Sequence, residues 1–386
     1  MEEEKKIRVA ITHGDTNGIG YEIILKTFAD PQMLELCTPI IYGSAKAAAF
    51  HKKLLGMPTT FNIISKAEDA KPGKINLLVT FDEEVRIDMG QPSKEAGEAA
   101  LKALDRAMTD FRSDLYDVLV TAPINKDNIQ SNLFKFCGHT EYIENSVGEG
   151  KKALMILLND KLRVALVTTH LPIKDVAAAI TKENITEKAT ILHNSLKRDF
   201  RISNPRIAVL ALNPHAGDNG VIGTEEKDAI TPAIEQLETN GIMAFGPYPA
   251  DGFFGSGNYN NFDAILAMYH DQGLAPFKTL AVENGVNYTA GLPIVRTSPD
   301  HGTAYDIAGK GIADENSFRQ AIYTAIDIFR NRREYDEATK DPLPKLYHEK
   351  RDDSDKARFS LPHPKEQFRA DNHPDRRQDK TQTTEK

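Results

Sequence analysis

Three histidines close behind apolar runs are residues whose types and spacing suggest chemistry. They are His170 after the run 162–169, His215 after 206–212 and His270 after 264–269. Each run has the length and composition of a buried strand, and open α/β sheets bind ligands beyond the carboxyl ends of their strands. Three imidazoles with an open fourth position suit a catalytic divalent metal. We therefore predict a metal site at one sheet edge, although a histidine taken singly is more often structural.

Two carboxylates stand near these histidines along the chain. Asp271 directly follows His270, and Asp251 lies in the turn-rich stretch 246–257. Carboxylates so placed can orient imidazoles that bind a metal, or influence the metal through hydrogen bonds to its ligands. His13 also ends a strand-like run, so the spacing alone does not separate it from the other histidines.

Two cations stand in stretches of apolar or small residues. Lys278 follows Ala-Pro-Phe, and Arg296 follows Gly-Leu-Pro-Ile-Val. A cation among apolar neighbours is costly unless it meets an anion. Together with Asn287 the two could hold a phosphate or carboxylate, the arginine through its bidentate fork. Two structural ion pairs explain the same cations about equally well.

Strand-like and helical segments alternate along most of the chain, which predicts a mainly parallel sheet covered on both sides. Ser93 is expected to cap an amphipathic helix, and the apolar runs 153–158 and 162–169 to form a hairpin. The stretch 264–278 is expected to be a strand followed by a turn at Gly273. We expect loops at 246–257 and from Val286 to Gly311, the second with the character of a binding loop.

Composition and charge exclude several classes of protein. The net charge is −8, from 48 basic and 56 acidic residues, which argues against nucleic acid as a partner. No apolar run is long enough for a membrane span, and the charged N-terminus does not resemble a signal peptide. Cys37 and Cys137 are too few for a disulfide framework. We expect a cytoplasmic protein.

Motifs narrow the chemistry without choosing a reaction. The glycines of HGDTNGIG do not fit the dinucleotide fingerprint, because Ile23 stands where its third glycine belongs. The sequence has no G-x-S-x-G elbow, no Walker loop and no H-E-x-x-H motif. It therefore gives no support to acyl transfer, P-loop phosphoryl transfer or metalloprotease chemistry. The spacing supports a metal-dependent enzyme that acts on a small anion.

At these residues the sequence resembles the 4-hydroxythreonine-4-phosphate dehydrogenases of vitamin B6 synthesis. The matching pieces are GDTNGIGYEI, GHTEY, TTHLPI, LNPHAGDNGVIGTEE, GPYPAD, AMYHDQGLAPFK and VNYTAGLPIVRTSPDHGTAYDIAGKG. The segment HGTAYDIAGKG also resembles the adenosine-binding loop of isocitrate and isopropylmalate dehydrogenases. The resemblance implies their fold, with two α/β domains, a cleft between them, and a mainly parallel sheet with some antiparallel strands.

The resemblance also guides the division of the chain. We expect a first α/β domain at 1–135 plus 286–335, and a second at 136–285 that carries metal and dimer contacts. Residues 336–386 are charged and dotted with proline, which predicts a disordered tail. The turn GDTNGIGYE departs from the family's usual GDPAGIGPE, which loosens the turn without removing a ligand.

The activity that the resemblance implies is an NAD-dependent, divalent-metal-dependent oxidation of 4-phosphooxy-L-threonine at C3. Decarboxylation then gives 3-amino-2-oxopropyl phosphate, a step of pyridoxine 5′-phosphate biosynthesis. A paralogue that oxidises another hydroxy-acid phosphate, such as 4-phospho-threonate or -erythronate, would carry the same site. A catalytically silent metabolite-binding protein is a more distant alternative. The general base stays open among Asp251, Asp271 and metal-bound water.

The resemblance further implies a role for each site residue. The metal, which is zinc, cobalt, manganese or, less naturally, magnesium, falls on His170, His215 and His270. Substrate contacts fall on His139, Thr140, Lys278, Asn287 and Arg296. Contacts to NAD fall on His301, Gly302 and Asp306. The resemblance implies a site shared across a homodimer, in which His270 completes a site whose other ligands belong to the partner subunit.

Overall fold

The computed structural model describes residues 6–81, 85–131, 134–136, 138–281 and 284–343. Contacts group Met1–Lys340 as one compact unit and Asp341–Lys386 as another. Most of the tail expected at 336–386 lies outside the described residues. Its first residues were assigned wrongly, because helix α11 (Asn316–Thr339) continues through them.

A single sheet of twelve strands runs through the described part of the first unit. Its order is β3 (Phe61–Ile64), β4 (Ile75–Val79), β2 (Cys37–Gly43), β1 (Ile7–Thr12), β5 (Val118–Thr121), β12 (Arg296–Pro299), β11 (Val286–Ala290), β6 (Leu154–Leu158), β7 (Arg163–Leu166), β10 (Ala264–Ala267), β8 (Arg206–Leu210) and β9 (Met243–Tyr248). The pairs β12–β11, β11–β6 and β6–β7 are antiparallel, and the other pairs are parallel. The expected mainly parallel sheet with some antiparallel strands is confirmed, and so is the β6–β7 hairpin.

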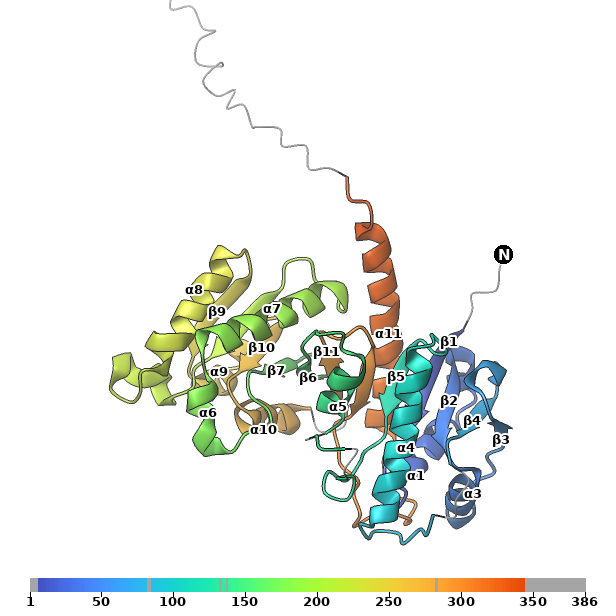
Figure 1. The fold of residues 1–386 in the computed structure, drawn as a ribbon. Coiled ribbons are helices and arrows are strands. Elements are labelled where there is room, and N and C mark those ends of the chain that lie inside the picture. The colour runs from blue at the N-terminus through green and yellow to red at the C-terminus, as the bar shows by residue number, and fades with distance from the viewer. Residues whose placement is uncertain (1–5, 82–84, 132–133, 137, 282–283, 344–386) are drawn as a thin grey trace, which may run out of the picture. The chain divides into compact units, whose positions relative to one another are not determined.

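Helices cover the sheet in two groups (Figure 1). Those beside β1–β5 include α1 (Gly20–Thr27), α2 (Gln32–Leu36), α3 (Ala45–Leu54), η1 (Ala67–Asp69) and α4 (Lys94–Phe111). Later in the chain come α5 (His139–Val147), α6 (Ile173–Ala179), α7 (Lys182–Arg198), η2 (Pro214–Gly220), η3 (Glu226–Ile230), α8 (Thr231–Thr239), α9 (Ala250–Gly255), η4 (Asn258–Asn261) and α10 (His270–Leu280). Ser93 caps α4 as expected, because its side chain accepts a hydrogen bond from the backbone N–H of Ala96. Among the described residues, no helix is long and apolar enough to cross a membrane.

The turn expected at Gly273 is wrong. The chain leaves β10 and enters α10 at His270, so that Gly273 lies inside the helix. A Cβ at this glycine would come within 2.8 Å of side-chain atoms of Val164 and Leu166 on β7. The glycine therefore allows close packing of a helix on a strand, and it does not mark a turn. The loop expected at 246–257 is also wrong in part, because it contains the end of β9 and all of α9.

The binding loop expected after Val286 is wrong for its first half. Strands β11 and β12 are central in the sheet and largely buried. Their polar residues misled the prediction, since a central strand is usually apolar on both faces. Here Thr297 donates to the backbone oxygen of Ala321 on α11, whereas Arg296 next to it contacts Thr121 and Thr289. Alternation along β12 thus assigns one face to α11 and the other to a polar site.

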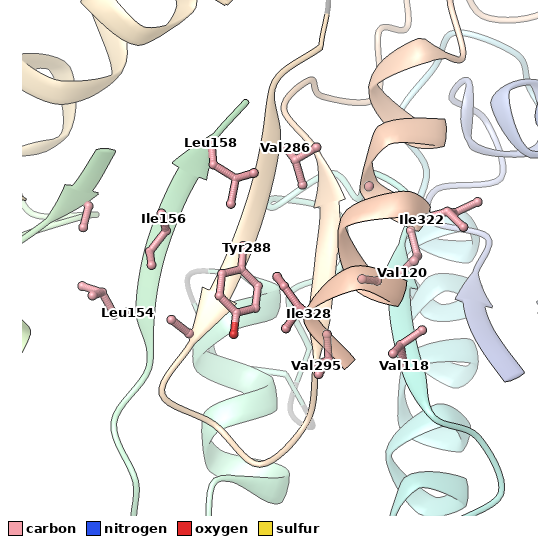
Figure 2. Packing of buried hydrophobic residues seen from close by; sticks show 14 of the residues in the cluster. Val118, Val120, Leu154, Ile156, Leu158, Val286, Tyr288, Val295, Ile322 and Ile328 are labelled. Carbon is pink, nitrogen blue, oxygen red and sulfur yellow. The ribbon is translucent and has the colours of Figure 1, made fainter. Parts of the chain in front are cut away.

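A buried core joins these strands to α11. Figure 2 shows Tyr288 of β11 between the β6 side chains and Val295, with Ile328 of α11 nearby. The Tyr288 hydroxyl donates to Asp199 Oδ2 at 2.5 Å, and Arg332 Nε lies 2.7 Å from Asp199 Oδ1. Arg332 also donates to the backbone oxygens of Leu292 and Pro293. This Asp199–Arg332–Tyr288 clamp joins the end of α7, α11 and β11.

We expect Asp199→Ala to lower the free energy of unfolding by about 3–5 kcal/mol, because it leaves the buried Arg332 without its carboxylate. The matched control is Asp336→Ala, which removes a pair with Arg198 that is largely exposed. That change should cost at most about 1 kcal/mol. Urea unfolding followed by circular dichroism measures both variants, and equal losses would contradict the special role of the clamp.

Candidate active site

A cavity of about 260 Å³ lies where α5, α10 and the central strands meet. Nine of the residues predicted from the sequence line it, namely His139, Thr140, His170, His270, Lys278, Asn287, Arg296, His301 and Gly302. The lining also includes Thr121, Lys126, Glu141 and Asp300, which the sequence analysis did not single out. The structure therefore brings most of the predicted residues together.

The strands that precede the three histidines are neighbours. Strand β10 pairs in parallel with β7 on one side and with β8 on the other. Their carboxyl ends therefore lie at one edge of the sheet, as the sequence analysis expected. The ring centroids of His170 and His270 lie 6.2 Å apart.

His215 is placed differently. Its side chain is exposed and does not line the cavity. Among the described residues, no group of three or more histidine, cysteine, aspartate or glutamate side chains is placed to hold a metal. The set of three histidine ligands thus stays a prediction, and one chain brings two of the three into the cavity.

The segment that carries His215 is strained. Residues 215–219 all have positive φ angles, between 43° and 76°, which makes one left-handed turn after β8. Left-handed backbone costs about 1–2 kcal/mol for each residue other than glycine, and such strain clusters at functional sites. Glu226 supports the turn, because its Oε1 accepts from the backbone N–H groups of Leu212 and Asn213 at 2.8 and 2.7 Å.

His170 and His270, two of the histidines that line the cavity, each contact a carboxylate. His170 Nδ1 lies 3.1 Å from Glu141 Oε1, and His270 Nδ1 lies 2.7 Å from Asp271 Oδ1. A carboxylate can only accept in such a pair, so each Nδ1 carries the proton and each Nε2 keeps its lone pair. Lys126 Nζ lies 3.1 Å from His170 Nε2. Two imidazoles that each contact a carboxylate through Nδ1 are a donor set that fits a divalent metal.

Arg296 is a buried cation beside the same cavity. Its side chain donates to the hydroxyl groups of Thr121 and Thr289, and the residue is 2% exposed. In the part of the chain that the structure describes, no carboxylate forms an ion pair with it. Burial lowers the pKa of Arg296 to about 10, and the charge of Glu141 opposes that shift. The guanidinium stays charged at neutral pH, so the structural ion pair considered for Arg296 is not found.

The first turn of α5 adds further anion-binding groups. Gly138 precedes the helix without a side-chain cap, so backbone N–H groups stay available next to His139 and Thr140. Burial lowers the pKa of His139 well below its ordinary value, and the charges of Arg296 and Lys126 lower it further. His139 is therefore a neutral imidazole at pH 7, which can form hydrogen bonds with an anionic ligand.

Lys278, in the last turn of α10, also lines the cavity. Its Nζ lies 3.4 Å from Asp300 Oδ1, so the ion pair considered as the alternative for this residue is present. The lysine side chain is about half exposed. Burial raises the pKa of Asp300, and the charge of Lys278 opposes that shift. The carboxylate of Asp300 is only 15% exposed, so Lys278 is the more accessible member of this pair.

The remaining predicted residues are divided. His301 and Gly302 line the cavity, and burial lowers the pKa of His301. Asp306 and Asp251 are exposed and do not line it. Asp251 lies in the first turn of α9. Asp271 reaches the site through its contact with His270.

His13 does not belong to this site. It is fully buried and stacks on Tyr21, with 5.2 Å between ring centroids, and Tyr21 stacks in turn on His51. Burial lowers the pKa of His13 to about 4. Its place at the end of β1 thus reflects packing beneath the first glycine turn.

Comparisons with known proteins agree with this site. Residues 35–325 match the family model described as pyridoxal phosphate biosynthetic protein PdxA. A 4-hydroxythreonine-4-phosphate dehydrogenase from Bacteroides thetaiotaomicron is 62% identical over 357 residues, which cover 92% of this chain and 98% of that protein. One from Sulfurihydrogenibium sp. is 43% identical, covering 85% of this chain and 100% of that protein.

A solved structure extends the agreement to the fold. The crystal structure of 4-hydroxythreonine-4-phosphate dehydrogenase from Klebsiella pneumoniae has a TM-score of 0.72 and 33% identity, covering 85% of this chain and 99% of that chain. The mixed α/β fold with a large, mostly parallel sheet is therefore shared with solved members of the same group. The chain belongs to the PdxA family of pyridoxal phosphate biosynthetic proteins.

Proposed function

We propose that this protein catalyses the NAD-dependent oxidation of 4-phosphooxy-L-threonine at C3, followed by decarboxylation to 3-amino-2-oxopropyl phosphate. The reaction would take place in the cytoplasm as a step of pyridoxine 5′-phosphate biosynthesis. The observation that carries the proposal is the buried Arg296, a cation without a carboxylate partner in the described chain, beside a cavity of about 260 Å³. The names of the relatives support the substrate.

The anionic ends of the substrate would bind among the groups that already lie around the cavity. Arg296 and Lys278 would neutralise the phosphate, the arginine through two parallel hydrogen bonds. Asn287 Oδ1 is buried and has no hydrogen-bond partner among the described residues, so it is available to accept from an amino or hydroxyl group of the substrate. Binding of the phosphate at a distance from C3 fixes the reacting carbon in place, which lowers the entropic part of the barrier.

His170 and His270 would hold a divalent metal together with His215, and His301 with Gly302 would contact NAD. Bound there, the metal would supply Lewis-acid chemistry and NAD would supply the hydride acceptor. Glu141 and Asp271 hold Nδ1 of the two imidazoles, so that Nε2 is the atom that would bind the metal, and Lys126, which now contacts His170 Nε2, would give up that contact. Asp306 lies outside the cavity lining and would have to meet the cofactor beyond it.

We further propose that two copies of the chain share each site. His215 is exposed and lies outside the cavity, although His170 and His270 line it. Apolar side chains are exposed beside these histidines, with Ile173 at 71% and Val221 at 82%. Exposed apolar groups that flank an incomplete site are typical of a protein interface. The partner's His215 would then complete the set. This division differs from the expected one, in which His270 alone came from the second subunit, because the rings of His170 and His270 lie 6.2 Å apart in one chain.

The substrate is tested by measuring NADH formation with 4-phosphooxy-L-threonine, 4-phospho-threonate and 4-phospho-erythronate. We expect the highest kcat/KM with 4-phosphooxy-L-threonine, loss of turnover on removal of divalent metal by a chelator, and recovery when zinc, cobalt, manganese or magnesium is returned. A higher kcat/KM with the threonate or the erythronate would overturn the substrate and favour the paralogue.

Arg296→Met should lower kcat/KM by about a hundredfold or more, because charged hydrogen bonds to a bound anion are worth about 2–5 kcal/mol. The same change should leave the protein at least as stable, since it removes a buried charge without an ion-pair partner. Steady-state kinetics and urea unfolding measure the two effects. Arg206→Met, at an exposed arginine, is the control and should keep its activity. A stability loss in Arg296→Met that accompanies the activity loss would point to a structural role instead.

A shared site predicts complementation between inactive variants. His215→Ala and His270→Ala should each abolish turnover alone, because each removes one proposed ligand. Mixed after subunit exchange, they should recover up to about a quarter of the original activity, since half of the dimers are mixed and each mixed dimer keeps one intact site. The activity of the mixture is compared with that of the separate variants, and no recovery after proven exchange would exclude ligands from different protomers.

A further inference from the structure

We propose that Glu141 is a positioning residue, which holds His170 ready for the metal and ties that histidine to the anion-binding turn of α5. The inference rests on the proposed function, because it assigns a role within the same site. It concerns a residue that the pattern of histidines and cations did not single out, and it starts from the contact between Glu141 Oε1 and His170 Nδ1 at 3.1 Å.

The contact fixes the orientation and the tautomer of His170. Glu141 can only accept, so the proton sits on His170 Nδ1 and the lone pair on Nε2 points away from the carboxylate. The position of Lys126 confirms that direction, because its amino group donates to the same Nε2 at 3.1 Å. A metal ligand needs this lone pair in a fixed direction, and without Glu141 the imidazole could turn about its side-chain bonds.

Glu141 can restrain the ring because it is itself restrained. It lies in the first turn of α5, directly after His139 and Thr140, and its side chain is 35% exposed. Its Oε1 accepts the hydrogen bond from His170, and the residue lines the same cavity as Arg296. The first turn of α5 thus carries His139 and Thr140, which are proposed to bind the substrate, and Glu141, which orients His170.

His270 offers an internal comparison. Its carboxylate partner, Asp271, is 84% exposed and adjacent in sequence. Water competes for an exposed carboxylate of this kind, so it restrains its partner less. Glu141 is less exposed, and it reaches His170 from a separate element of the fold. We therefore place the main orienting contact of the metal site at Glu141.

The test measures cobalt binding to the full-length protein by titration calorimetry and by the visible absorption of bound Co²⁺, with no substrate present. Glu141→Ala and Glu141→Met should bind cobalt about 10–100-fold more weakly, because both remove the acceptor for His170 Nδ1. The methionine keeps the side-chain volume in case the alanine variant does not fold. Glu141→Gln retains an acceptor oxygen and should recover most of the affinity.

Glu144→Ala is the matched control on the same helix. Glu144 contacts Lys152 and the backbone N–H of Ala153, away from the cavity, so this variant should bind cobalt as the unchanged protein does. Cobalt affinity in Glu141→Met equal to that of the unchanged protein would overturn the positioning role. His170→Ala distinguishes an error in the proposed metal site from an error in the positioning role of Glu141. If His170→Ala also binds cobalt normally, the proposed metal site itself is wrong; if it loses cobalt while Glu141→Met keeps it, the positioning role alone is wrong.

Discussion

The contact of Asp199 with Arg332 and Tyr288 fixes the strand on which the site is built. Tyr288 lies between Asn287 and Thr289 on β11, and neighbouring residues of a strand point to opposite faces. With Tyr288 held in the core by Asp199, Asn287 and Thr289 must face the other way. That face is where Asn287 lines the cavity and Thr289 contacts Arg296. An interaction on one face of the sheet therefore determines which residues of β11 face the cavity on the other.

Burial of the charged Arg296 side chain destabilises the folded protein, because the guanidinium loses its hydration. Threonine hydroxyl groups satisfy several of its N–H donors but do not neutralise its charge. Desolvation of a cation is repaid in full only by an anion in good geometry. The position of Arg296 is set by β11 and β12, which lie at the centre of the sheet. An anionic ligand then gains an interaction for which the desolvation of the protein side has already occurred.

The parts of the site that follow strand ends could be predicted from the sequence. His170 and His270 come after apolar runs and line the cavity, and the strands before them, β7 and β10, prove to be parallel neighbours. Gly273 was misread because a glycine needed for close packing and a glycine needed for a turn look the same in a sequence. Strands β11 and β12 were missed because their polar residues face a cavity, which only the folded sheet creates.

Glu141 and Lys126 illustrate a different limit. Both contact His170, from positions 29 and 44 residues earlier in the chain. No spacing rule connects a residue in the first turn of a helix with a residue beyond a strand of another part of the sheet. Their roles depend on where α5 lies relative to the end of β7, which is a property of tertiary packing. Residues of this kind become visible only when the partners of each imidazole nitrogen are accounted for.

The contrast between His170 and His215 bears on how the complete site forms. His170 is held in the cavity by contacts on both ring nitrogens, and so it is prepared within one chain. His215 lies exposed on a left-handed turn that Glu226 supports through the backbone. Strain of this kind clusters at functional sites, and here it is found outside the cavity lining of the same chain. It is explained if the turn presents His215 to a second copy, so that the stored strain is part of the cost of assembling a site between two protomers.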